Sequence, residues 1–118
     1  MRTKKFTEKV IFCAMSKKTF YLREHIVKFV LEKGFTPTCA FMMFSYFLLD
    51  TVHRVSLINA NNELICRSDE LWVFGPISDG VIKEIELARS LDMIVRFFDF
   101  EPVVLNFSEI SEDKAIME

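Results

Sequence analysis

The order of apolar and polar positions predicts strands that alternate with helices. Unbroken apolar runs at residues 10–14 and 71–74 are typical of strands buried on both faces. Between residues 20 and 33 the apolar side chains recur every three or four positions, which is the period of a helix. Gly34 is a fitting stop for that helix, and the same period returns in residues 81–88.

Two more elements are predicted in the middle of the chain. Residues 36–41 form a strand candidate, and Pro37 favours a place at its start or at the sheet edge, because proline cannot donate to a strand ladder. Residues 50–67 read as a second long helix. Asp50 or Thr51 could cap its first turn.

The ends of the chain carry weaker patterns. Asp92 closes the helix that contains residues 81–88, and residues 93–98 form a fourth strand. Residues 102–107 read either as a fifth strand or as an extended packing segment. Residues 1–8 are predicted to be a flexible arm, and residues 108–118 a polar tail or short helix.

This alternation predicts one α/β domain over residues 1–118, with helices on both faces of a mainly parallel sheet. Right-handed crossovers restrict the topology to a small, doubly wound, flavodoxin-like set. We expect three layers, four or five strands and the strand order 2-1-3-4. Half of the 118 residues are hydrophobic and thirteen are Phe, which suffices for a core.

Composition excludes several partners. The net charge of −2 gives no reason to expect a nucleic-acid polymer, and no apolar run approaches the roughly 20 residues of a membrane helix. Cys13, Cys39 and Cys66 are an odd number without a CxxC pair, which favours reduced thiols and a cytoplasmic protein. We expect no metal and no cofactor.

Residues 67–88 contain the candidate chemistry. They read as a strand, a polar loop and the start of a helix, the usual place for a ligand at the carboxyl edge of a parallel sheet. Glu84 lies one turn into this helix. Asp79 is most simply the N-cap, which does not exclude a ligand role.

Residues 78–88, S-D-G-V-I-K-E-I-E-L-A, resemble the nucleoside 2-deoxyribosyltransferase-like family. That small, doubly wound family has a helix start of the form D-x-G-x-x-x-E-[IL]-G-x-A. Gly80 and Glu84 share its spacing, and Glu84 falls on the position of the family's catalytic nucleophile. Residues 68–73 and 11–16 are similar to its third and first strands.

The resemblance implies an enzyme that breaks the N-glycosidic bond of a nucleoside or nucleoside monophosphate. Such chemistry needs a carboxylate nucleophile and an acid that protonates the leaving base. Glu84 fits the first role, and the positive end of the helix dipole favours its ionised form. The acid could be Asp69, Glu63 or a residue of another subunit.

Six residues are candidates for substrate contacts. Asp79 could bind sugar hydroxyls, with Gly80 beside it, and Ser16 and Lys17 could hold a 5′-phosphate. The solvated-loop alternative for the latter pair stays open, because no glycine-rich cradle is present. The remaining two candidates are Phe12, where the family commonly has Tyr, and Asn62, on an otherwise apolar helix face.

Two other classes of function remain open. Departures from the family pattern at Phe12, residues 15–16 and Glu86 favour a non-catalytic nucleotide-binding module. The apolar, Met- and Phe-rich residues 41–49 favour a homo-oligomer, and hence an interaction protein of the same fold, although they could equally pack on their own core. Glu84 itself could be a solvated helix carboxylate.

Overall fold

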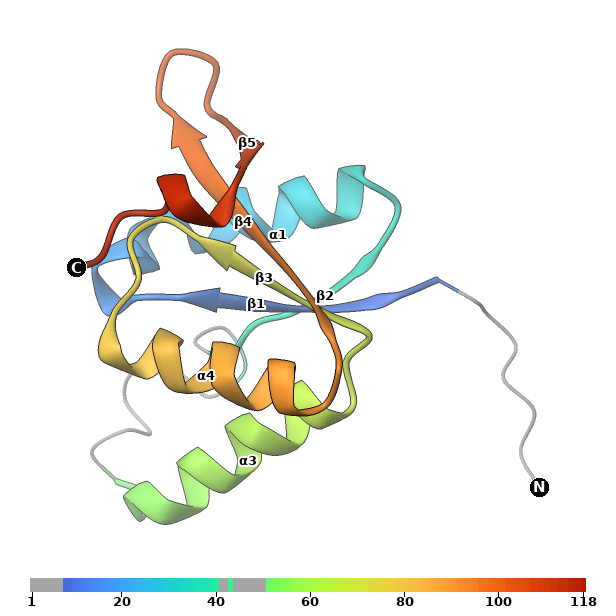
Figure 1. Cartoon of the computed structure of the whole chain (residues 1–118), viewed down its shortest axis with the longest axis vertical. Coiled ribbons are helices and arrows are strands. Elements are labelled where there is room, and N and C mark those ends of the chain that lie inside the picture. The colour runs from blue at the N-terminus through green and yellow to red at the C-terminus, as the bar shows by residue number, and fades with distance from the viewer. Residues whose placement is uncertain (1–7, 41–42, 44–50) are drawn as a thin grey trace.

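Helices cover both faces of a five-stranded sheet, so the predicted doubly wound α/β class is confirmed (Figure 1). The computed structural model describes residues 8–40, 43 and 51–118. Across the sheet the strands are β2 (Thr36–Thr38), β1 (Val10–Met15), β3 (Glu70–Phe74), β4 (Ile94–Glu101) and β5 (Asn106–Ile110).

The first four strands pair in parallel, and the predicted order 2-1-3-4 is confirmed. The short strand β2 lies at one edge, where Pro37 costs no central ladder bond. Central strand β3 is buried along its whole length, which explains its unbroken apolar run. β5 joins the other edge antiparallel to β4.

Each face of the sheet has its own core. On one face, helix α1 (Arg23–Glu32), preceded by the 3-10 helix η1 (Lys17–Leu22), packs on aromatic side chains of β3, β4 and β5. On the other face, α3 (Arg54–Cys66) and α4 (Asp79–Ser90) pack side by side (Figure 1). Alternation along each strand assigns neighbouring residues to opposite cores.

The helix boundaries correct several predictions. Gly34 ends the first helix as predicted, with φ +89°. The predicted caps were wrong: Ser78 caps α4, so that Asp79 is its first helical residue, and His53 caps α3 rather than Thr51. In each case the capping side chain accepts a bond from the backbone N–H two or three residues on, Val55 N for His53 and Val81 N for Ser78.

The C-terminal region also differs from prediction. The fifth strand begins at Asn106, because residues 102–105 form the turn that reverses the chain, with Leu105 at φ 52°. Residues 108–118 are not simply a tail: they complete β5, form η2 (Glu112–Lys114), and pair Met117 with Ile77.

Two predictions fall mainly outside the described residues, namely the arm at residues 1–8 and the oligomer contact at residues 41–49. In the part of the chain that the structure describes, no helix is both long and apolar enough to cross a membrane.

Candidate functional site

The carboxyl edge of the sheet has its topological switch point between β1 and β3. The chain leaves β1 toward α1 on one face and leaves β3 toward α4 on the other, so that the two following loops diverge. Gly75, with φ +77°, begins the second loop, and a Cβ there would lie 3.0 Å from Thr19 Oγ1. Only glycine therefore lets this loop approach η1 so closely.

Ser16 lies at this edge, directly after β1, and is almost fully buried. Its hydroxyl accepts a hydrogen bond from the Lys18 backbone N–H at 3.0 Å and donates one to the Glu118 carboxylate at 2.7 Å. Glu118 reaches it because its own N–H donates to the Ile77 carbonyl at 2.9 Å. A carboxylate of the chain itself therefore occupies the place next to Ser16, while Lys17 is exposed.

The first turn of α4 is open to solvent. Asp79 and Gly80 are both exposed, and a Cβ added at Gly80 would meet only Ser78 Oγ, at 3.9 Å. The Ser78 hydroxyl accepts a hydrogen bond from Val81 N at 3.3 Å. The helix start thus has its cap in place and leaves room beside two of the predicted substrate-binding residues.

Glu84 lies in the second turn of α4 and faces α3. The Asn61 side-chain amide donates a 2.6 Å hydrogen bond to its carboxylate. Burial raises the pKa of Glu84 from 4.5 to about 7, and the bond from Asn61 lowers it only in part. The helix N-terminus was predicted to bias Glu84 toward its ionised form, but the net pKa shift runs the other way because desolvation between two helices dominates.

Asn61, rather than the predicted Asn62, is the amide that points into the fold. Asn62 is exposed, and so is Ile58 of the face on which it was placed. The buried side of α3 passes instead through Leu57, Asn61 and Ile65. The predicted face was displaced by one position, about 100° around the helix, because the apolar residues of α3 surround it.

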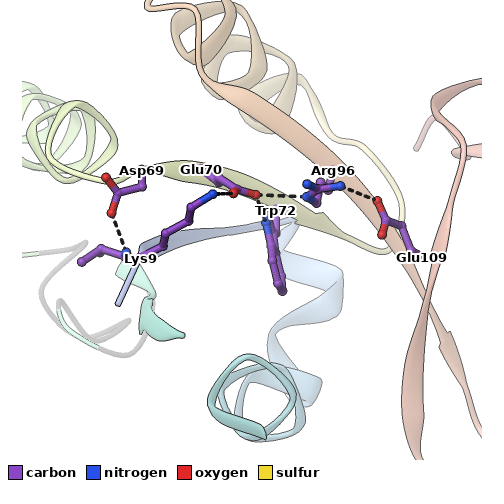
Figure 2. A network of polar contacts seen from close by, with 7 residues as sticks. Lys9, Asp69, Glu70, Trp72, Arg96 and Glu109 are labelled. Carbon is purple, nitrogen blue, oxygen red and sulfur yellow. Dashed lines mark hydrogen bonds and ion pairs between the residues drawn. The ribbon is translucent and has the colours of Figure 1, made fainter. Parts of the chain in front are cut away.

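Two other predicted residues lie away from the carboxyl edge. Phe12 is 1% exposed in the core beneath α3 and α4. Asp69 precedes β3 at the amino edge, where its carboxylate accepts a 2.7 Å bond from Val10 N (Figure 2). Since Asp69 binds the backbone of β1 and Glu84 binds α3, the structure does not bring the two predicted catalytic carboxylates to one site.

Next to Asp69 is a charged network that the sequence analysis missed. Glu70 has a 4% exposed side chain, and its Oε1 accepts bonds from Trp72 Nε1 and Arg96 Nε, both at 3.0 Å. Its Oε2 accepts one from Lys9 Nζ at 2.9 Å. Arg96 continues to Glu109 at 3.4 Å, so the network crosses four strands or strand ends (Figure 2).

The partners of Glu70 decide its protonation. Burial alone would raise the pKa of Glu70, but the bonds from Trp72, Lys9 and Arg96 together hold it below 4.5. The same contacts raise the pKa of Arg96. One signal was available in the sequence: Arg96 is a single charge within the apolar run of residues 93–98, and a buried charge requires a partner.

Within residues 8–40, 43 and 51–118, no group of three or more His, Cys, Asp and Glu side chains is placed to hold a metal ion. The family model of a domain of unknown function, DUF7768, matches residues 12–98. The match runs from β1 into β4 and so includes the switch point, Glu84 and Glu70. No curated protein matches the chain.

Proposed function

The chain belongs to the DUF7768 family, and on that premise we propose that it is an enzyme acting on the N-glycosidic bond of nucleosides or nucleoside monophosphates. The observation that carries this proposal is Glu84, a partly buried carboxyl with a pKa of about 7 and one neutral partner, Asn61. Carboxyl groups tuned toward neutral pH by burial are concentrated at functional sites. The resemblance of residues 78–88 to the deoxyribosyltransferases supports the same assignment.

In this mechanism the ionised Glu84 attacks the anomeric carbon. The carbon–nitrogen bond breaks, its electron pair goes to the base, and the base leaves with a proton from an acid. Water or a second base then displaces Glu84, which gives hydrolysis or transfer. The Asn61 amide holds the attacking carboxylate in one orientation, and the exposed Asp79 contacts the sugar hydroxyls.

The test is release of free base from a panel of nucleosides and nucleoside 5′-monophosphates, followed by chromatography. Glu84→Ala is expected to lower the rate by about 10³-fold or more, because the nucleophile is lost. Glu86→Ala, two residues along on an exposed position of the same helix, is the matched control and keeps the rate. With wild type the rate rises with pH through about 7, as Glu84 ionises.

Absence of base release from every substrate, or equal rates for Glu84→Ala and wild type, would contradict the enzyme. A second candidate function then gains weight, a non-catalytic nucleotide-binding module. One observation favours it: Asp69, the predicted acid, is bound to the backbone at the opposite edge of the sheet. It predicts that a nucleotide raises the melting temperature without any product.

We also propose that the protein is cytoplasmic. The support is that Cys13 and Cys66 are free thiols, and Cys66 is exposed.

A further inference from the structure

Residues 115–118, which we call the C-terminal strap, return to the carboxyl edge of the sheet and pair with the loop between β3 and α4 (Figure 1). The Ile77 backbone N–H donates to the Ile116 carbonyl at 2.8 Å, and the Glu118 N–H donates to the Ile77 carbonyl at 2.9 Å. Met117 therefore pairs in parallel with Ile77, as an isolated bridge outside the sheet.

Glu118 joins the two loops that diverge at the switch point. Its backbone N–H holds Ile77, in the loop after β3, and its carboxylate accepts the 2.7 Å bond from the hydroxyl of Ser16, directly after β1. Its side chain is 20% exposed, and Ser16 beneath it is 2% exposed. In doubly wound folds a ligand binds in the crevice between two such loops. A side chain of the protein itself therefore lies across this crevice.

The contacts that hold the strap are weak. Ile116 and Met117 are 62% and 59% exposed, so their apolar side chains gain little from burial. The ammonium of the exposed Lys18 lies 3.8 Å from the Glu118 carboxylate, a distance at which an exposed ion pair contributes little. Ala115 packs against the core beneath α3 and α4 and anchors the start of the strap. Segments with few buried apolar contacts open locally while the rest of the fold stays intact.

We propose that the C-terminal strap is an autoinhibitory contact: Glu118 closes the switch-point crevice, and a nucleotide must displace it in order to bind between the two loops. The identity of the ligand rests on the proposed function, whereas the closed crevice does not. A ligand that binds only the open form has an apparent dissociation constant raised in proportion to the closed fraction. Loosening the strap is therefore expected to tighten binding.

The test is the dissociation constant of each of the four deoxynucleoside 5′-monophosphates, measured by NMR titration of the whole chain. Glu118→Ala removes the bond to Ser16 and is expected to lower the dissociation constant about fivefold to tenfold. Hydrogen exchange of the Ile77 amide, which donates to the strap, should become faster in the same variant.

Two further variants separate occupation of the crevice from the loss of a negative charge. Glu118→Gln keeps a carbonyl acceptor for Ser16, so its dissociation constant should change by less than about twofold. Asp113→Ala removes a carboxylate from an exposed position of η2 and should leave the dissociation constant unchanged.

Three results would overturn the strap. They are equal dissociation constants for wild type and Glu118→Ala, equal gains in Glu118→Ala and Glu118→Gln, and absence of binding to both wild type and Glu118→Ala. Base release is measured on the same samples. Tighter binding by Glu118→Ala without base release contradicts the proposed enzyme and supports the strap, whereas base release with an unchanged dissociation constant contradicts the strap alone.

Discussion

Glu70 and Glu84 are two carboxylates withdrawn from solvent at the two ends of one strand–loop–helix unit, and they have opposite properties. Glu70 exposes only 3% of its surface, yet its pKa lies below 4.5. Glu84 exposes more of its surface, yet its pKa rises to about 7. The exposed surface of a carboxylate therefore does not set the order of the two pKa values.

The partners explain the difference. Glu70 accepts bonds from two cations and an indole, which compensate both of its oxygens. Among the described residues Glu84 accepts a hydrogen bond from the neutral amide of Asn61, which cannot balance a negative charge. A buried carboxylate that is paired with cations keeps a low pKa, and one with a neutral partner keeps a raised pKa.

The largest expected effect comes from Glu70→Gln. The neutral amide leaves Arg96 and Lys9 without their shared carboxylate, so the free energy of unfolding should fall by about 2–3 kcal/mol at pH 7, measured by urea denaturation. Because the folded-state pKa of Glu70 lies below 4.5, the loss is fully present above pH 4.5 and shrinks as the pH falls below it.

Glu109→Gln is the control for Glu70→Gln, since Glu109 is the exposed end of the same network. This variant should lower the free energy of unfolding by less than about 0.5 kcal/mol. Equal costs for the two variants would show that burial does not distinguish them.

Glu84→Gln should change the free energy of unfolding in the opposite direction from Glu70→Gln, and over a different pH range. The folded-state pKa of about 7 exceeds the unfolded value of 4.5, so ionised Glu84 destabilises the fold increasingly as pH rises between these values. We expect the variant to match wild type near pH 4.5 and to exceed its unfolding free energy by roughly 2 kcal/mol at pH 8.

The exposed Glu86→Gln is the control here and should show no such pH dependence. A pH-independent difference between Glu84→Gln and wild type would remove the contrast between the two carboxylates.

The smallest expected effect is that of Asn61→Ala. It removes the bond that lowers the pKa of Glu84, so the pKa should move further above about 7, which a ¹³C NMR titration of the carboxyl carbon measures. The unfolding free energy should fall by about 1 kcal/mol at pH 5, for one lost hydrogen bond. Asn62→Ala, at the exposed neighbouring position, should change neither quantity.

Much of the fold followed from local patterns. The apolar runs of β1 and β3 could only be buried on both faces, and the helical stripe after Ser78 could only cover one. Strand order then followed from the handedness of the crossovers. β5 was less predictable, because the apolar residues 103–105 lie in the turn that precedes the strand and not in the strand itself.

The helix that carries Glu84 was predictable from the sequence, but the pKa of Glu84 was not. The role of Glu84 is a prediction from the resemblance of residues 78–88. The amide next to Glu84 was misassigned by one residue, because apolar and polar residues are mixed on every side of α3 and do not mark its buried face. The Glu70 network was missed, since Lys9, Trp72 and Arg96 come from three strands or strand ends.

The sequence by itself determined which main segments become strands and helices and that β1 and β3 are buried on both faces, because these depend on periodicity along a few consecutive residues. Only the tertiary structure decided that Glu70 is ionised, that Glu84 titrates near neutrality, and that Glu118 lies against Ser16. The physical reason is that the protonation of a charged group depends on whatever lies within a few ångströms of it. Those neighbours are distant along the chain: Arg96 is 26 residues from Glu70, and Glu118 is 102 residues from Ser16.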